Sequence, residues 1–482
     1  MSETGLCDLA VVGLGVMGGN LARNFASRGL RVAGYQRTVE HAHALAAAHP
    51  EAHLRVASTL EELVKMLERP RRIVLMVNAG PAVDSVLDQL DPLLEEGDIV
   101  VDGGNSLYTD TDRRVARAET RPWRFVGMGV SGGAEGALLG PSIMPGGDRY
   151  AWERLRPPLE AIAARSPSGV CVTYCGRGSA GHFVKMVHNG IEYGDMQLIA
   201  EVASLMRDGM GWPWGQVADA FAGWNRGELE SYLVEITADI LRVPDPQNPG
   251  ALLIDAILDR AGQKGTGKWT VVAAAEHGVP IPTIAAAVDA RLLSAAKDLR
   301  GRAEAALRPS RGVVQGVSVD DLRDALYASK IASYTQGFAL LQAASEARDY
   351  GTNLAEIARI WTGGCIIRAV FLERIRASFA QASRPSGPEA ADKPELLVLA
   401  PDFAADVARR LPGWRRVVAA AAAAGHPIPG LSASLAWFDT LTRSRGSASL
   451  IQAQRDYFGS HTYERVDAPG VFVHTEWPRS SQ

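Results

Sequence analysis

Short apolar runs alternate with amphipathic segments along the first part of the chain. The apolar runs occur in DLAVVGLG, RVAGYQR, RRIVLMVNAG and GDIVVDGGNS, and NLARNFASRG between the first two has helical periodicity. This alternation is typical of βαβ units and a parallel sheet. Two more segments, WRFVGMGVSGGAEGALLG and PSGVCVTYCG, extend the pattern, so we predict a first, α/β domain over residues 1–179.

The periodicity changes from Gly181 onward to long helical segments rich in Ala, Leu and Ile, with few strand-like runs. We therefore predict a large, all-α second domain over residues 180–440. Turn-rich stretches interrupt it, and the polar, Pro-rich SRPSGPEAADKPE at residues 383–395 is predicted to be a surface loop.

The helical region contains an internal repeat. EYGDMQLIAEVASLMRDG aligns with SYTQGFALLQAASEARDYG, which places Tyr193 opposite Tyr334 at an offset of 141 residues. Further on, Trp224 aligns with Trp361 at an offset of 137. These landmarks favour a duplicated helical unit over chance similarity between Ala-rich helices.

Five polar residues fall within VKMVHNGIEYGD, residues 184–195, at the spacing of one helix face. They are Lys185, His188, Asn189, Glu192 and Tyr193. A solvated face is the common explanation of such a stripe. The second copy of the repeat has Leu326, Ser329 and Ser333 where the first has Lys185, His188 and Glu192, so either drift or a function confined to one copy explains the asymmetry.

Length and charge narrow the function classes. A chain of 482 residues exceeds what one core usually organises, and 47% hydrophobic residues allow a core of ample size. The net charge of -4 and the pI of about 6.2 give no reason to expect nucleic acid or a membrane surface as partner. Small-molecule chemistry or protein association is the better expectation.

Cysteine usage and the absence of targeting patterns indicate a soluble, cytoplasmic protein. The four cysteines, Cys7, Cys171, Cys175 and Cys365, are too scattered for a disulfide framework and are expected to be reduced structural thiols. They form no metal-ligand set with neighbouring histidines, so no metal is expected. The N-terminus carries acidic residues where a secretory signal would be basic, and the apolar tract from Val417 is too short to span a membrane.

A glycine-rich turn follows the first apolar run and opens the first helical segment. In this context it predicts a dinucleotide site in a Rossmann-type domain, with the pyrophosphate at the helix N-terminus. The turn consists of Gly13, Leu14, Gly15, Val16, Met17 and Gly18. The second strand ends in Gln36, Arg37 and Thr38 instead of the acidic residue that NAD sites usually place there, which favours NADP.

Further candidate ligand contacts follow the later strands. Val77, Asn78 and Ala79 end one apolar run, and Asn105 follows another, at the sheet edge where open α/β sheets bind ligands. The glycine-rich stretch at residues 129–147 is similarly placed. It suits backbone contacts to an anionic ligand, with a flexible loop as the alternative.

These motifs resemble, over nearly the whole chain, the decarboxylating 6-phosphogluconate dehydrogenases. The resemblance rests on GLGVMGGNLA, DGGNSLYTDT, GVSGGAEGA, GPSIMPGG, GHFVKMVHNGIEYGDMQLI, KGTGKW, GGCIIR and SLIQAQRDYFGSHTYER. It implies oxidation of 6-phosphogluconate at C3 with NADP, loss of carbon dioxide and formation of ribulose 5-phosphate. It also implies a homodimer with shared active sites, in which a C-terminal tail, residues 441–482, reaches the partner subunit.

The resemblance also implies roles for individual residues. Lys185 is the base that accepts the C3 hydroxyl proton, and Glu192 is the acid that completes the ketose. Along the sugar acid it places Asn105, Ser131, Gly132, Gly133, His188 and Asn189. At the phosphate it places Tyr193, Lys264, Arg291, Arg455 and His461.

Three positions depart from the family pattern: Gln36, Asn78 and Thr362 stand where Asn, Lys and Arg are common. The change at Asn78 leaves the strength of cofactor binding open. Two alternatives also remain open. One is an NADP-dependent dehydrogenase of another β-hydroxyacid, and the other is an NADP-binding sensor without catalysis, against which the presence of both base and acid argues.

Overall fold

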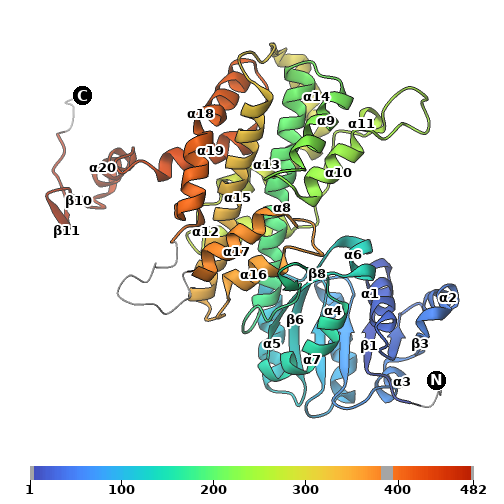
Figure 1. Ribbon diagram of the computed structural model, residues 1–482. Coiled ribbons are helices and arrows are strands. Elements are labelled where there is room, and N and C mark those ends of the chain that lie inside the picture. Colours follow the sequence, from blue (N-terminus) through green and yellow to red (C-terminus); the bar gives the residue numbers. More distant parts are fainter. Residues whose placement is uncertain (1–4, 382–394, 479–482) are drawn as a thin grey trace.

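The computed structural model describes residues 5–381 and 395–478, so the predicted surface loop at residues 383–395 lies, apart from Glu395, outside the described residues. Figure 1 shows an α/β domain that carries a helical domain, and a C-terminal segment that projects from the helical domain.

The first domain is built on a seven-stranded sheet with the order β3-β2-β1-β4-β5-β6-β7. The strands are β1 Leu9–Val12, β2 Val32–Tyr35, β3 Arg55–Val56, β4 Arg72–Leu75, β5 Ile99–Asp102, β6 Arg124–Ser131 and β7 Ser142–Gly147. Its helices are α1 Val16–Ser27, α2 Val39–Ala48, α3 Leu60–Lys65, α4 Pro81–Leu90, α5 Tyr108–Glu119, α6 Gly133–Leu139 and α7 Arg149–Ile162. This arrangement confirms the predicted α/β class.

Both faces of the sheet are covered, which explains why its strands are continuous apolar runs. In β1, Leu9 and Val11 face one apolar cluster while Ala10 and Val12 face the other, because successive strand residues point to opposite sides.

The sheet differs from the predicted one at its far edge. β7 pairs antiparallel with β6, so the sheet is mixed. PSGVCVTYCG does not supply a full strand: it contributes β9 Gly169–Val170, which pairs with β8 Arg165–Ser166, and a single bridge between Val172 and Ile143. Residues 129–147 form β6, α6 and β7, so the flexible-loop alternative for this stretch is wrong.

The second domain repeats one order of helices, as the predicted duplication requires. The first copy contains α8 Ala180–Ser204, a π-helical turn Leu205–Gly209, α9 Trp214–Trp224, α10 Tyr232–Ile240, α11 Leu253–Ala256, α12 Thr266–Glu276, α13 Pro282–Ala295 and α14 Lys297–Leu307. The second contains α15 Val319–Ala347, α16 Leu354–Ile360, α17 Phe371–Gln381, α18 Pro401–Ala423 and α19 Pro429–Leu441. The order α8, α9, α10, α12, α13 thus corresponds to α15–α19.

The two long helices of the repeat, α8 and α15, pack antiparallel through the centre of this domain. Nζ of Lys330 donates to Asp195 Oδ2 over 2.6 Å, and the hydroxyls of Ser179 and Tyr350 lie 2.7 Å apart. The start of α8 therefore lies beside the end of α15.

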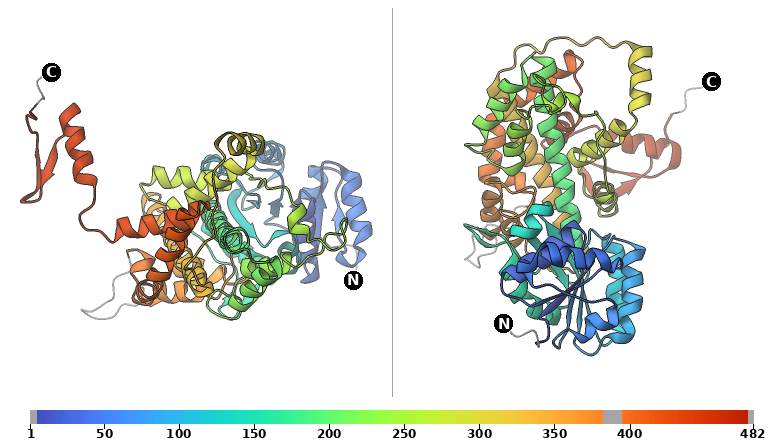
Figure 2. Two further views of the ribbon diagram at one scale, coloured as in Figure 1. Left: turned by 90° about the horizontal axis from the view of Figure 1, so that it is seen from above. Right: turned by 90° about the vertical axis from the view of Figure 1, so that its right-hand side faces the viewer.

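The chain ends in α20 Ala448–Gly459 and a hairpin of β10 Tyr463–Arg465 and β11 Ala468–Val473. Figure 1 and the left view of Figure 2 show this segment standing away from the rest of the molecule.

Glycines let α8 lie directly on β6 and β7. A Cβ atom on Gly129 would lie 2.3 Å from Cβ of Lys185, and one on Gly181 would lie 2.2 Å from the carbonyl oxygen of Gly127. Such distances are impossible without a shift of the backbone. The contact therefore fixes how close Lys185 sits to the end of the sheet.

We expect Gly129→Ala to lower the free energy of unfolding by about 1–3 kcal/mol, because the added methyl group has no space. Gly215→Ala is the matched control, since no atom lies within 4 Å of the added Cβ there. Chemical denaturation measures both, and equal stabilities would contradict the packing argument.

Candidate active site

The predicted polar face of α8 is real, and its first half is buried. Lys185 is 6% exposed and His188 is inaccessible to solvent. A solvated face is therefore the wrong explanation for these two residues. An unbroken helix from Ala180 to Ser204 places them on the same side as Asn189 and Glu192, as the spacing predicts.

Short contacts join this face to the edge of the sheet. Nζ of Lys185 donates to Oδ1 of Asn189 over 2.6 Å, and Nδ1 of His188 lies 3.1 Å from the same oxygen. Nε2 of His188 lies 3.2 Å from the hydroxyl of Ser131, the last residue of β6. The structure thus brings Ser131, Lys185, His188 and Asn189 together.

Glu192 extends this group by one turn, with Oε2 3.8 Å from Nδ1 of His188. Burial raises the pKa of Glu192, while the Lys185 ammonium opposes the shift. Burial lowers the pKa of Lys185, against the Glu192 carboxylate. Burial, followed by the Lys185 charge, holds the pKa of His188 well below its usual value. Burial thus shifts the titration of all three groups toward their neutral forms.

The second copy of the helical repeat also contacts the polar residues of α8, and the sequence did not indicate this contact. The ring of His188 meets Trp361 edge to face, with centroids 5.4 Å apart. Trp361 was visible only as an alignment landmark. Cys365 is inaccessible, and burial raises the pKa of its thiol to about 12, so it stays protonated beside Lys185. All four cysteines are free and buried, as predicted.

The glycines after Ser131 form a tight corner. Gly132 has a φ of +125° and precedes α6, which begins at Gly133. A Cβ atom on Gly132 would lie 2.5 Å from the carbonyl oxygen of Gly364, so only glycine fits against the second helical copy. Thr362 nearby donates to Ser166 over 2.7 Å.

The predicted phosphate residues divide into two groups. Tyr193 is buried, and the Arg291 guanidinium lies 3.6 Å from the centre of its ring. Lys264 lies exposed on the loop before α12. Arg455 and His461 belong to the projecting segment, so one chain does not bring them to its own α8 face (Figures 1 and 2).

A cleft of about 370 Å³ lies at the start of α1. Six of the predicted cofactor residues line it, namely Gly13, Gly15, Gln36, Arg37, Val77 and Asn78. The sequence did not indicate the other eight lining residues, among them Tyr35, Leu60, Ser85 and Gln89. Because α3 and α4 supply Leu60, Ser85 and Gln89, no motif near the glycine turn could have identified them.

The glycine turn has the geometry that a pyrophosphate requires. Gly13 adopts a φ of +96°, and a Cβ atom on Gly18 would lie 1.9 Å from the carbonyl oxygen of Gly13. The amide of Leu14 donates to Oε1 of Gln36 over 2.8 Å, which holds the turn against β2. Val16 and Met17 begin α1. The N-H groups there remain available to an anion.

Three other predicted contacts, Thr38, Ala79 and Asn105, are not among the residues that line the cleft. Thr38 precedes α2, Ala79 lies in the loop after β4, and Asn105 lies exposed in the loop after β5. Asn78 is also exposed, so its amide faces solvent.

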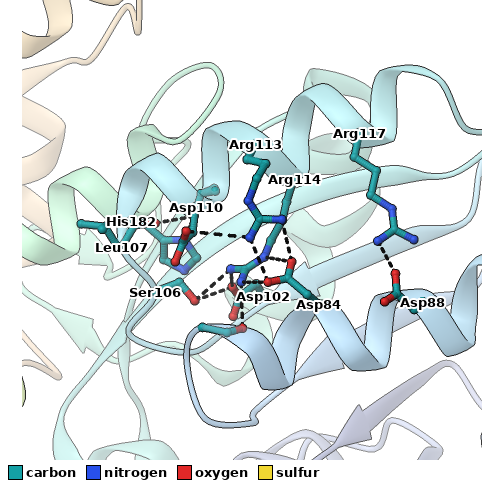
Figure 3. Close-up of polar contacts among 12 residues, drawn as sticks. Asp84, Asp88, Asp102, Ser106, Leu107, Asp110, Arg113, Arg114, Arg117 and His182 are labelled. Atoms are coloured by element: carbon teal, nitrogen blue, oxygen red, sulfur yellow. Dashed lines mark hydrogen bonds and ion pairs between the residues drawn. The ribbon is translucent and has the colours of Figure 1, made fainter.

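A buried arginine ties these two loops together (Figure 3). Arg114 is inaccessible; its Nη2 donates to the carbonyl oxygen of Gly80 over 2.9 Å, and its Nε donates to Asp84 over 2.9 Å. Nη1 lies 3.3 Å from Asp102, which also accepts from Ser106 over 2.6 Å. Arg114 therefore links the loop that carries Asn78 to the loop that carries Asn105.

Two kinds of site find no support among the described residues. No group of three or more His, Cys, Asp or Glu side chains could hold a metal ion within residues 5–381 and 395–478. In the same part of the chain, no helix is long and apolar enough to cross a membrane.

A dinucleotide-binding α/β domain whose sheet edge meets a buried lysine and a glutamate on a helical domain defines a class of nucleotide-dependent oxidoreductases. Matches to protein-family models agree with this class. Residues 8–176 match the NAD binding domain of 6-phosphogluconate dehydrogenase, and residues 181–477 match the C-terminal domain of 6-phosphogluconate dehydrogenase. The chain belongs to the 6-phosphogluconate dehydrogenase family.

Individual relatives are similar along their whole length. The chain is 51% identical to the decarboxylating 6-phosphogluconate dehydrogenase of Synechococcus elongatus, over 98% of this chain and 99% of that one. It is 49% identical to the chloroplastic decarboxylating enzyme 3 of Arabidopsis thaliana, over 99% of both chains. A solved structure of 6-phosphogluconate dehydrogenase from Plasmodium falciparum matches with a TM-score of 0.92 and 44% identity, over 98% of this chain and all of that one.

We expect Arg114→Met to lower the free energy of unfolding by about 3–5 kcal/mol, because it leaves the inaccessible Asp102 without its cation. Arg113→Met is the matched control: Arg113 is 56% exposed and pairs with the same Asp84. Thermal and chemical unfolding compare the two variants. Equal losses would show that Arg114 does not connect the two loops.

Proposed function

We propose that this protein oxidises 6-phosphogluconate with NADP and decarboxylates it to ribulose 5-phosphate and carbon dioxide. The observation that carries the proposal is the buried face of α8, where burial favours a neutral Lys185 and a protonated Glu192 beside the cofactor edge of the sheet. The names of the full-length relatives support the substrate and the decarboxylation, and the Plasmodium falciparum structure is described in complex with its cofactor NADP+ and its substrate 6-phosphogluconate.

The glycine turn and the 370 Å³ cleft fit a dinucleotide. Gly13, Leu14, Gly15, Val16, Met17 and Gly18 hold the pyrophosphate, Gln36, Arg37 and Thr38 meet the 2'-phosphate, and Val77, Asn78, Ala79 and Asn105 border the nicotinamide side. When bound, NADP supplies the acceptor for the hydride from C3. Arg37 is exposed at the cleft and has no side-chain partner among the described residues, so it is available to a phosphate.

Lys185 acts as the base. Its neutral amine accepts the C3 hydroxyl proton while the C3 hydride leaves, so C3 becomes a ketone. The resulting β-keto acid loses carbon dioxide, because the electrons of the breaking bond pass into the new carbonyl group. No metal is required for that step. Asn189 accepts a hydrogen bond from Nζ and orients the amine.

Glu192 acts as the acid that protonates carbon and completes the ketose. It stands seven residues, roughly 10 Å, from Lys185 along the helix, which leaves room for the substrate between them. His188 and Asn189, with Asn105, Ser131, Gly132 and Gly133, bind the sugar acid. Tyr193, Lys264 and Arg291 bind the phosphate together with Arg455 and His461.

The assignment of Arg455 and His461 to the phosphate implies a homodimer with shared active sites. The projecting segment exposes large apolar side chains, with Phe458 73%, Phe472 68% and Leu450 64% accessible. Such exposure favours association. In this proposal residues 1–179 bind the cofactor, residues 180–440 bind substrate and form the dimer, and residues 441–482 reach the partner subunit. We also propose a cytoplasmic location.

The first test combines 6-phosphogluconate with NADP or NAD and follows nicotinamide reduction and carbon dioxide release. We expect stoichiometric release of carbon dioxide and a preference for NADP.

Arg37→Ala should raise KM for NADP about 10-fold or more and leave KM for NAD nearly unchanged, since one charge-assisted bond to phosphate contributes about 1.5–3 kcal/mol. Reduction without carbon dioxide, or faster turnover of a β-hydroxyacid that lacks phosphate, would refute the proposed reaction.

The pH dependence of kcat tests the two catalytic roles. Turnover requires a neutral Lys185 and a protonated Glu192, so it should fall at low pH, where Lys185 is charged, and at high pH, where Glu192 is ionised, which gives a bell-shaped profile. Lys185→Ala should reduce kcat by about 10²–10⁴, and Glu192→Gln should remove the alkaline limb. The exposed Lys65→Ala serves as control. An unchanged alkaline limb in Glu192→Gln would exclude Glu192 as the acid.

Mixing two impaired variants tests the shared site. Arg455→Ala and Lys185→Ala homodimers should each be weakly active, the first through a raised KM for 6-phosphogluconate. Heterodimers formed by unfolding and refolding the mixture should recover activity, because one of their two sites has both residues. No recovery, with dimers verified by sedimentation, would mean that each chain supplies its own Arg455.

A further inference from the structure

The helical domain has a second cleft, and the duplication relates its position to that of the active site. In the first copy, the start of α8 meets the segment that follows α16, where Trp361 contacts His188. In the second copy, the start of α15 supplies Arg323, which shares a cleft with the end of α9 and the residues that follow it, within residues 223–229. The two clefts are therefore built from corresponding elements.

Backbone contacts support this relation. The two corresponding segments pair with each other: the amide of Tyr232 donates to Arg368 over 3.1 Å, and the amide of Val370 donates to Glu230 over 3.1 Å. An isolated antiparallel bridge joins Ser231 and Ala369 between them. Together with the antiparallel pair α8 and α15, these contacts describe an approximate two-fold relation within one chain. The second cleft thus lies at the opposite end of α8 and α15 from the α/β domain.

The chemistry of the second cleft differs from that of the first. It has a volume of about 460 Å³ and is lined by four arginines, Arg226, Arg323, Arg409 and Arg410, with Trp224 and Glu228. In place of Lys185, the second copy has the inaccessible Leu326. The cleft therefore has no counterpart of the catalytic base, but it concentrates guanidinium groups.

Carboxylates hold part of this cluster in place. Arg410, 4% exposed, pairs with Glu228 and Asp406, and its guanidinium carbon lies 4.3 Å from the centre of the Tyr327 ring. Arg323 pairs with Asp320 over 3.0 Å and approaches Asp324, and Arg409 pairs with Asp406. These contacts fix the arginines against one wall.

Donors nevertheless remain unused. Arg226 is exposed, and its side chain has no hydrogen-bond or ion-pair partner within residues 5–381 and 395–478. Nε of Arg410 and Nε of Arg323 have no hydrogen-bond partner in the same part of the chain, although Nε of Arg410 lies 3.6 Å from Oδ1 of Asp324. Arg409 uses only Nη2 in its contact with Asp406. Planar groups with several free N-H donors match a phosphate, which accepts paired hydrogen bonds.

We propose that this cleft is a second, non-catalytic site that binds a small phosphate-bearing anion. Arg226 and Arg409 supply free donors, Arg410 is held in the wall of the cleft by Glu228 and Asp406, and Trp224 lies beside the ligand. The duplication that left catalysis in one copy thus left an anion site in the other.

Inorganic pyrophosphate is the probe for the first experiment. Calorimetric titration of the full-length protein is made with 6-phosphogluconate and NADPH present, so that the proposed substrate and dinucleotide sites are both filled and no turnover occurs. We expect one pyrophosphate per chain, with at least 10-fold weaker binding in the Arg226→Ala, Arg409→Ala double variant. Arg415→Ala, exposed on the same helix and paired with Asp439, is the control and should bind normally.

Fluorescence gives an independent readout, since pyrophosphate should change the emission of the wild type but not that of Trp224→Phe. Circular dichroism establishes that the variants fold. No binding to the wild type, or equal binding to the double variant, would overturn the proposal. Because neither readout requires turnover, the result is independent of the reaction proposed for the α8 face.

Discussion

The close packing of α8 against β6 and β7 is the constraint on which the rest of the structure depends. Gly129 and Gly181 remove the side chains that would separate helix and sheet, so Cβ of Lys185 lies almost on the strand backbone. On its other side α8 packs along α15, where the inaccessible pair of Lys330 and Asp195 fixes the contact. A lysine held between these layers has little water, and burial favours its neutral form. The ability of Lys185 to act as a base thus depends on its packing as much as on its being a lysine.

The same packing explains what the sequence could and could not predict. The spacing of Lys185, His188 and Glu192 placed them correctly on one helix face, because helical periodicity is a local property. Burial of that face depends on elements far along the chain, so Trp361 could not be assigned to it from a pattern. The glycines at residues 129–147 suggested a ligand loop, yet most of that stretch is regular structure, and Gly129 serves helix packing.

The asymmetry of the duplicated domain follows from what each copy packs against. The start of α8 faces the α/β domain, whose strand end supplies Ser131 to His188. The corresponding part of α15 meets α18 and the segment after α9, and its equivalents of the polar face, Leu326, Ser329 and Ser333, are all buried. One scaffold thus presents two different environments. The tail that carries Arg455 belongs to neither copy, which is why no single chain completes the proposed phosphate site.

The central claim is that burial lowers the pKa of Lys185, and the most direct measurement is the ionisation of Lys185 itself. Trace acylation at a series of pH values, quantified by mass spectrometry, compares Lys185 with the exposed Lys264 in the same molecule. The account predicts a clearly lower midpoint for Lys185, and a shift back toward that of Lys264 when the protein is unfolded. Equal midpoints in the folded protein would contradict it.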